Sequence, residues 1–324
     1  MPKIDENFKL DLKDRKILYE LDLNSRESCS KIGKKVGLSS EVVNYRIKKL
    51  DEEKIITHYQ TIVNFSKLNI IQFKICLSFQ HLKSEKLKEI IEVLKKNKSV
   101  KWIASCNGNW DMLITLETDS FEKIDVLKSE VLALFSGYIN QKAISILVEA
   151  STHNRDYLLD RNLRSERIIM NKDKVVKLDE TDLEILKYLA ENSRKQIIDI
   201  AISLGISERI VNYKIKQLVK NKVITGFKIA INYEKLGIKF FKTFIYLDNP
   251  SELKIKEIVN YLKKYPNVIH YVKVLGNWEL EPEFEVYTEE RFNEILNEIK
   301  DRFSDVIKKV DIITIEKEHK FVYF

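Results

Sequence analysis

The hydrophobic and polar positions of residues 39–50 repeat with the period of an α-helix. The apolar residues on one side of that helix are Val43, Ile47 and Leu50. The polar residues on the opposite side are Glu41, Asn44, Tyr45 and Lys48. Gly37 gives the backbone the freedom for a tight turn before the helix, and Ser39 or Ser40 is a natural N-cap. Such a helix must bury its apolar side and present its polar side outward.

This two-faced helix occurs a second time, 168 residues further along the chain. Its apolar side consists of Val211, Ile215 and Leu218. Its polar side consists of Arg209, Asn212, Tyr213 and Lys216. Residues 10–58 and 178–226 are identical at 21 of 49 positions without a gap, far more than chance allows. The sequence therefore predicts a tandem duplication of a helix-turn-helix unit.

The stretches around each two-faced helix complete a larger unit. Residues 10–24 and 28–36 have the pattern of two further helices, and the β-branched run 55–63 has that of a strand. Residues 70–147 predict a βαββαβ order, which is the ferredoxin-like arrangement, and residues 239–315 repeat it. Pro282 cannot donate a ladder hydrogen bond, so its strand is expected at a sheet edge or with a bulge.

These patterns predict an α+β fold of two tandem repeats, each a winged-type helix-turn-helix domain followed by a βαββαβ ferredoxin-like domain. The expected helix-turn-helix domains are residues 1–64 and 178–233, the expected ferredoxin-like domains are residues 65–150 and 234–324, and residues 151–177 are the expected linker. Because one chain holds two copies of the unit, we expect the two sheets to pair face to face within it.

The composition limits the class of protein but does not identify a binding partner. The 324 residues are 44% hydrophobic and 32% charged, with a net charge of +7 that is compatible with an anionic partner but does not require one. The sequence has no apolar run of about 18 residues and no signal-like N-terminus, so neither a membrane-spanning nor a secreted protein is expected. Three cysteines without a C-x-x-C pair favour a reducing cytoplasm.

The motif residues resemble the Lrp/AsnC family of feast/famine transcription regulators. Leu10, Asp14, Ile17, Leu18 and Leu21 fit the pattern L-x-x-x-D-x-x-I-L-x-x-L. Residues 37–50 fit G-L-S-x-x-x-V-x-x-R-I-x-x-L, and residues 108–111 read Gly-Asn-Trp-Asp between the two middle strands. The resemblance covers nearly the whole chain, twice. The tandem arrangement departs from the single unit that is usual in the family.

The resemblance implies both the partners and the mode of action. In the family, the N-terminal unit binds DNA, and the βαββαβ part, called the RAM domain, pairs chains and often binds an amino acid. It implies double-stranded DNA as a partner, an amino acid as a possible effector, a homo-oligomer assembled through the ferredoxin-like domains, and no membrane. It implies no cofactor.

The candidate DNA-binding residues lie on and beside the two reading helices. In the first copy they are Lys34, Lys35, Ser40, Glu41, Asn44, Tyr45, Lys48 and Lys49. In the second copy they are Glu208, Arg209, Asn212, Tyr213, Lys216 and Gln217. Amide and ammonium groups suit base edges and phosphates, respectively. Tyr45 and Tyr213 could equally be partly packed instead of contacting bases. Arg46 and Lys214 are expected to stabilise their own units rather than to contact DNA.

The turn at residues 108–111 is the candidate effector site. Its residues are Gly108, Asn109, Trp110 and Asp111, with Gly276 and Asn277 in the second copy. The turn offers backbone N–H donors and a carboxylate, which suit the two charged groups of an amino acid. An equally open interpretation is a plain β-turn with positive φ at the glycine and a packed Trp. Residues 279–282 of the second copy, Glu-Leu-Glu-Pro, suggest a degenerate site there.

Two alternatives to a DNA-binding regulator remain open from the sequence. Siroheme decarboxylases share the two-part architecture, but residues 100–109 contain no His or Arg and the matching strand offers only His270 and Lys273. A helix-turn-helix unit can also serve as a protein-interaction module. The five histidines are scattered without metal-ligand spacing, and no catalytic motif is present, so neither a metal site nor an enzyme is expected.

Overall fold

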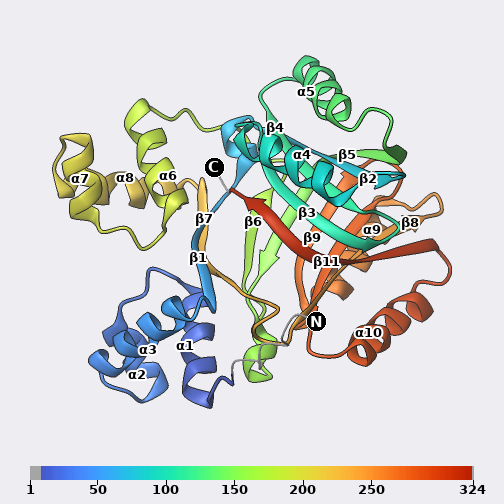
Figure 1. Ribbon diagram of the computed structural model, residues 1–324. Helices are drawn as coiled ribbons and strands as arrows, with labels where there is room; N and C mark the ends of the chain where they lie inside the picture. The colour runs from blue at the N-terminus through green and yellow to red at the C-terminus, as the bar shows by residue number, and fades with distance from the viewer. Residues whose placement is uncertain (1–8, 323–324) are drawn as a thin grey trace.

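The computed structural model describes residues 9–322, and its N-terminal part is a three-helix unit (Figure 1). The unit comprises α1 (Leu12–Leu23), α2 (Cys29–Val36) and α3 (Ser40–Glu52). Asp11 begins α1 with a capping box, in which the Asp11 and Asp14 side chains each accept the backbone N–H of the other residue. Gly37 ends α2 at φ +68°, and Ser39 caps α3 by accepting the Val42 N–H.

The second copy folds in the same way. It comprises α6 (Glu180–Glu191), α7 (Ile197–Leu204) and α8 (Glu208–Lys220). Asp179 and Asp182 form the capping box, Gly205 takes φ +65° and Ser207 caps α8. The apolar stripes predicted for both reading helices are buried, which confirms the two-faced pattern.

A two-stranded ribbon joins the two helix-turn-helix units. β1 (Ile56–Val63) and β7 (Ile224–Ile231) pair antiparallel. Where the units meet, the hydroxyls of Ser25 and Ser193 lie 2.6 Å apart, although these residues occupy the same position in the two copies. Arg26 donates to the carbonyl of Ser193, and Arg194 donates to the carbonyl of Ser25. The copies are therefore related by a pseudo-twofold axis through this contact.

The first ferredoxin-like domain follows η1 (Phe65–Leu68). Its elements are β2 (Ile71–Phe79), α4 (Ser84–Lys96), β3 (Val100–Gly108), β4 (Met112–Thr118), α5 (Phe121–Leu134) and β5 (Ile139–His153). The second domain contains β8 (Lys239–Leu247), α9 (Glu252–Leu262), β9 (Val268–Leu275), β10 (Leu280–Val286), α10 (Glu289–Arg302) and β11 (Ile307–Phe321). The predicted fold class, with two tandem repeats, is confirmed.

The two sheets close into one ring of eight strands, a β-barrel. The order is β5-β2-β4-β3 in the first repeat and β11-β8-β10-β9 in the second. β3 pairs with β11 and β5 pairs with β9, so both inter-repeat edges are hydrogen-bonded. The sequence predicted contact between the sheets but not this pairing of edges. β10 has a neighbour on each side, so the edge alternative for Pro282 is wrong, and a register shift lies between Glu283 and Phe284.

The helices cover the outer faces of the ring (Figure 1), and the inner faces of the two sheets pack against each other. Trp110 and Trp278, equivalent in the two copies, meet inside with ring centroids 6.2 Å apart. The interior also holds the fully buried carboxylate of Glu281, which pairs with Lys74 and lies 2.8 Å from Lys242. Burial alone would raise the pKa of Glu281, but the two ammonium groups outweigh it and lower that pKa to about 2.

Residues 151–177, expected as a linker, are largely ordered against both repeats. β5 continues to His153, η2 spans Asp156–Leu159, and β6 (Glu166–Met170) pairs with β5. Within this segment the buried Arg155 guanidinium lies 2.6 Å from Asp22 of α1 and 2.8 Å from Glu285 of β10. Burial alone would lower the pKa of Arg155, but the two carboxylates raise it well above its ordinary value. Arg155 thus ties the first helix-turn-helix unit to the second sheet.

Replacing Arg155 with Ala should destabilise the protein strongly, because Asp22 and Glu285 would remain buried without their partner. Breaking a buried ion pair in this way typically costs about 3–5 kcal/mol. Denaturant unfolding measures the effect, with the exposed Lys187→Ala as control, whose pair with Glu184 should contribute less than about 1 kcal/mol. Equal stability of the two variants would contradict the role assigned to Arg155.

Candidate functional site

The polar face of α3 points away from the protein. Glu41, Asn44, Tyr45, Lys48 and Lys49 are exposed. Ser40, the first residue of the helix, is half-buried. Tyr45 exposes 67% of its surface, so it does not pack into the core as one interpretation allowed. The face presents the carboxylate of Glu41, one amide, one phenol and the ammonium group of Lys48.

The equivalent face of α8 is arranged alike. Its exposed residues are Glu208, Arg209, Asn212, Tyr213 and Lys216. Gln217 is half-buried, and Tyr213 exposes 60% of its surface. Figure 1 shows both helix-turn-helix units beyond the β1–β7 ribbon, on the side away from the barrel. Both polar faces are therefore open to solvent on the same molecule.

Arg46 and Lys214 brace their units, as the sequence predicted. The Arg46 guanidinium lies 2.7 Å from the carboxylates of both Asp11 and Asp14. In the second copy, Lys214 pairs with Asp179 and lies 3.2 Å from Asp182. These bonds connect each reading helix to the capping box of the first helix, so the two cations are committed to the fold.

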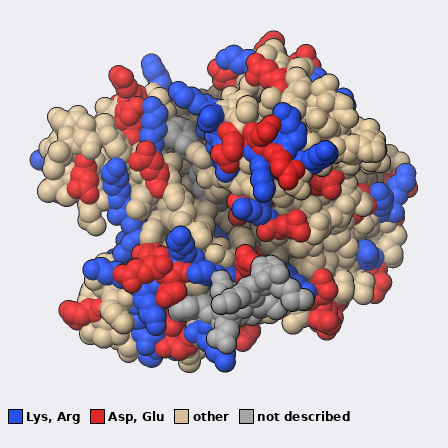
Figure 2. Space-filling view, in the orientation of Figure 1, with Lys and Arg blue, Asp and Glu red and all other residues tan. Residues whose placement is uncertain are grey.

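The helices that precede the reading helices differ between the copies. Lys35 lies 2.6 Å from Glu20, whereas Lys34 forms no ion pair with any residue that the structure describes. At the position of Lys34 the second copy has Ile202, which exposes 74% of its surface, and Ile198 on the same helix exposes 50%. Figure 2 shows a surface around α7 that is largely free of charge. The first copy thus has the better surface for an anionic backbone.

The turn at Gly108–Asp111 is shaped by packing. Gly108 has φ +128°, and a Cβ there would lie 2.5 Å from the Ile312 carbonyl oxygen on β11. Trp110 is buried inside the barrel, and one carboxylate oxygen of Asp111 accepts the Phe79 N–H at 2.6 Å. The interpretation as a structural turn is therefore supported. Asn109 and Asp111 of the same turn are exposed.

A cavity of about 670 Å³ opens beside this turn. Both repeats contribute to its lining, which includes Gly108, Asn109, Asp111 and Asn277 together with Lys142, Lys309 and Asp311. Gly276 does not line it, and in the second copy Glu279 takes the structural role of Asp111 by accepting the Leu247 N–H. The cavity brings two carboxylates and two ammonium groups within one polar space.

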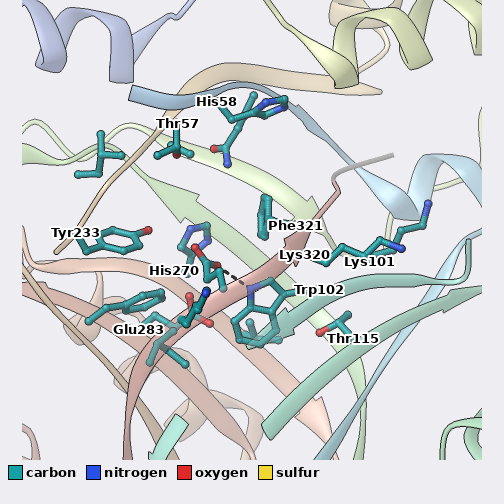
Figure 3. A pocket seen from close by; sticks show the side chains of 18 of the residues that line it. Thr57, His58, Lys101, Trp102, Thr115, Tyr233, His270, Glu283, Lys320 and Phe321 are labelled. Atoms are coloured by element: carbon teal, nitrogen blue, oxygen red, sulfur yellow. Dashed lines mark hydrogen bonds between the residues drawn. The ribbon is translucent and has the colours of Figure 1, made fainter. Parts of the chain in front are cut away.

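A larger cavity, of about 910 Å³, lies between the β1–β7 ribbon and the barrel (Figure 3). Thr57 and His58 of β1 reach it from one side, and Trp102, His270 and Glu283 reach it from the barrel. His319 lines it as well, so three of the five scattered histidines surround one space. Even so, no group of His, Cys, Asp and Glu within residues 9–322 has the arrangement of a metal site.

Sequence reasoning missed this larger cavity. Its lining comes from short pieces of many strands, and no single piece has a recognisable spacing. The one usable signal is the duplication, because Trp102 and His270, like Thr115 and Glu283, occupy equivalent positions and differ in chemistry. Such a divergence at facing positions is visible only once the pseudo-twofold axis is known.

Family comparisons agree with the geometry of both helix-turn-helix units. A family model of the AsnC-type helix-turn-helix domain matches residues 10–51, and a model of a winged helix-turn-helix DNA-binding domain matches residues 178–225. None of the helices described between residues 9 and 322 is long and apolar enough to cross a membrane.

Relatives among archaeal regulators match single units of the chain. The HTH-type transcriptional regulator Ptr1 of Methanocaldococcus jannaschii is 34% identical over 102 residues, which are 32% of this chain and 68% of that protein. An uncharacterized HTH-type transcriptional regulator of Pyrococcus furiosus is 33% identical over 147 residues, which are 44% of this chain and 97% of that protein. One almost complete relative thus corresponds to less than half of this chain.

A solved structure matches the tandem arrangement as a whole. The crystal structure of the siroheme decarboxylase NirDL superposes with a TM-score of 0.60 at 16% identity, covering 96% of this chain and 93% of that one. A second crystal structure of that enzyme contains an iron-uroporphyrin III analogue. At this identity the likeness concerns the fold alone.

The packing of the 108–111 turn predicts different costs for two glycine substitutions. Gly108→Ala should destabilise the protein by roughly 2–4 kcal/mol, because both its positive φ and the Ile312 carbonyl oppose a Cβ. Gly137→Ala is the matched control: its φ is +82°, but no atom lies within 4 Å of the added Cβ, so about 1–2 kcal/mol is expected. Thermal or denaturant unfolding measures both, and an equal cost would show that β11 does not confine the turn.

Proposed function

Because the chain belongs to the Lrp/AsnC family, we propose that it is a sequence-specific, double-stranded-DNA-binding transcription regulator. The observation that carries this proposal is the pair of outward polar faces on α3 and α8, held on one molecule by the β1–β7 ribbon. Reading helices of paired helix-turn-helix units enter major grooves about one helical turn apart, roughly 34 Å, or a multiple of it. Such a regulator acts where the genome lies, which in a prokaryote is the cytoplasm.

Each polar face supplies two kinds of contact. The exposed amides of Asn44 and Asn212 suit adenine edges, where a bidentate pair discriminates by roughly 1–3 kcal/mol. The exposed ammonium groups of Lys34, Lys48 and Lys216 suit phosphates, which fix the position of a protein on the duplex without reading sequence. The remaining candidates on the two faces would contact flanking bases or sugars.

The two copies should not read identical half-sites. Glu41 of the first face corresponds to Arg209 of the second, and Lys49 corresponds to Gln217. The exposed Ile202 in place of Lys34 removes a phosphate contact from the second copy. One chain should therefore bind an imperfect palindrome, with the first copy contributing more of the salt-dependent affinity.

Selection of bound sequences from a random duplex pool tests this proposal. The wild-type protein should enrich an imperfect palindrome, whereas Asn44→Ala should lose preference in one half-site and keep nonspecific affinity. Lys34→Ala should instead weaken binding to all sequences alike and reduce the slope of log affinity against log salt by about one. Lys123→Ala, on the outer helix α5, should change neither.

Two results of this selection would count against the proposal. If the wild-type pool yields no enriched motif, the result favours the alternative that the helix-turn-helix units are protein-interaction modules. The exposed isoleucines of α7 would then be the expected contact surface. If Asn44→Ala enriches the same motif with the same strength, α3 is not the reading helix.

We also propose that an amino acid effector binds in the cavity beside Gly108, Asn109 and Asp111. The second Asp111 oxygen would accept from the ligand ammonium group. Lys142 would hold the ligand carboxylate together with Lys309, which also lies 2.9 Å from Asp311. Asn109, Asn277 and the Trp110 backbone complete the surroundings. Gly276 contributes only by shaping the second turn.

Calorimetric titration with the twenty amino acids tests the effector site. At least one should release or absorb heat with one site per chain, and Lys309→Ala should weaken it, because the ligand carboxylate would lose a charge-assisted bond worth roughly 1.5–3 kcal/mol. Lys308→Ala, one residue away and outside the cavity lining, is the control. If none of the twenty amino acids produced heat, the effector proposal would be wrong, and the proposal of DNA binding would be unaffected.

Assembly beyond one chain would need surfaces other than the sheet edges. The edges that could pair two single-unit chains are already joined within this chain as β3–β11 and β5–β9. We propose that a homo-oligomer, if formed through the ferredoxin-like domains, uses their helices or the rim of the 670 Å³ cavity. The pairing unit itself is complete in one chain.

An enzyme of the siroheme decarboxylase type is the alternative proposal. The likeness of the whole fold and the presence of His270 in the larger cavity favour it. Glu283 and Glu318, which line the same cavity, oppose it, because a tetrapyrrole substrate carries several carboxylates of its own. We therefore propose regulation rather than catalysis as the function.

A further inference from the structure

The larger cavity contains a carboxylate without a cationic partner. Glu318, on β11, lines the cavity and accepts a hydrogen bond of 2.7 Å from the Trp102 indole N–H. Among residues 9–322, no Lys, Arg or His forms an ion pair with it. Its side chain is accessible to water although protein surrounds it, as expected for a group that faces a cavity. A carboxylate in such a place favours a cation brought by a ligand.

Most cations of the lining are bonded to groups other than Glu318. Lys74 pairs with Glu281, Lys101 lies 3.2 Å from Glu117, and Arg155 is shared by Asp22 and Glu285. Lys320 donates to the carbonyls of Lys95 and Asn97. None of these four side chains forms an ion pair with Glu318. Lys239, which lies 3.6 Å from Glu289, and Lys317 also line the cavity, and neither forms an ion pair with Glu318.

A second polar group of the lining, the Ser151 hydroxyl, lacks a hydrogen-bond partner. Ser151, on β5, is 1% exposed, and its hydroxyl makes no hydrogen bond to any described residue. Buried polar groups without partners are uncommon and need an explanation. Since Ser151 lines the same cavity as Glu318, a ligand with a second hydrogen-bonding group would satisfy it.

The remaining walls are aromatic. Trp102, Tyr233 and Phe240 line the cavity, and the rings of Tyr233 and Phe240 lie 5.1 Å apart. Aromatic faces attract organic cations and also cover their carbon chains. The volume of about 910 Å³ lies within the range of cavities that hold small molecules.

We propose that this cavity binds a small organic cation, a di- or polyamine or its guanidinium counterpart. One ammonium group pairs with Glu318, a second N–H donor reaches Ser151, and the methylene chain packs against the aromatic walls. This ligand differs in charge and place from the amino acid proposed for the 108–111 turn. Thr57 and His58 of β1 line the cavity too, so the ligand also touches the ribbon that carries both helix-turn-helix units.

The cavity should bind amines better at higher pH. Burial raises the pKa of Glu318 to about 7; the Trp102 N–H opposes the rise, Glu283 and Glu285 add to it, and Arg155 opposes it. Below that pKa the carboxyl is neutral and attracts no cation, and above it the charge is present. His270 stays neutral in this range, since burial lowers its pKa to about 4. Amine affinity should therefore rise by up to about tenfold between pH 6 and pH 8.

Calorimetry with putrescine, spermidine and agmatine tests the proposal, with 1,4-butanediol as the neutral probe. At least one amine should bind the wild-type protein at pH 8, and the diol should not. Glu318→Gln keeps an oxygen for the Trp102 N–H but removes the charge, so it should weaken amine binding at least tenfold and abolish its pH dependence. Glu298→Gln, on the outer helix α10 and outside the cavity lining, should bind as the wild type does.

Thermal unfolding without ligand separates loss of the site from loss of the fold. Glu318→Gln should melt no lower than wild type at pH 8, because it removes an uncompensated charge. Failure of every amine to bind at millimolar concentration, or equal weakening by both Gln variants, would overturn the proposal. Binding of iron uroporphyrin in place of amines would overturn it too, and would favour the decarboxylase alternative. DNA selection without amine is independent of these results, so failure here would leave the proposed function intact.

Discussion

The closure of two four-stranded sheets into one ring is the constraint on which the structure depends. A four-stranded sheet leaves backbone donors and acceptors unpaired at both edges, and such edges invite association with other chains. Here β3 bonds to β11 and β5 bonds to β9, so each repeat satisfies the edges of the other. The inner faces then have only each other to pack against. Neither repeat can bury its inner apolar face alone, because Trp110 and Trp278 belong to one shared core.

Closure also explains why charged side chains are tolerated inside. Lys74 and Lys242 come from equivalent positions of the two repeats and both reach Glu281, which only the second repeat supplies. A buried carboxylate between two ammonium groups keeps its charge, since separating either partner would leave an uncompensated ion in a medium of low dielectric constant. The network therefore holds the repeats in one register. Arg155 extends the same principle to the first helix-turn-helix unit, through Asp22.

Much of this architecture follows from local sequence. The turn at Gly37, the cap at Ser39 and the apolar stripe of α3 depend on neighbours within a few residues, so periodicity and capping rules predict them. The continuation of β5 to His153 was not predicted, because residues 151–153 owe their strand conformation to β9 and β6, which are distant in sequence. The candidate DNA-binding residues were placed on exposed faces for the same local reason. The larger cavity was missed because its walls meet only after the ring closes.

Duplication within one chain permits a chemistry that a symmetric dimer of identical chains cannot have. In such a dimer every residue near the twofold axis appears twice, so a carboxylate at the position of Glu318 would come with a second one nearby. Here the equivalent position is Ala150, and the positions equivalent to Trp102 and Ser151 are occupied by His270 and His319. One acid without an ion pair, one indole donor and one hydroxyl without a hydrogen bond can then surround a single ligand. A cavity on a pseudo-twofold axis can thus accommodate an unsymmetrical ligand, while the helix-turn-helix units outside it keep the paired geometry that duplex DNA requires.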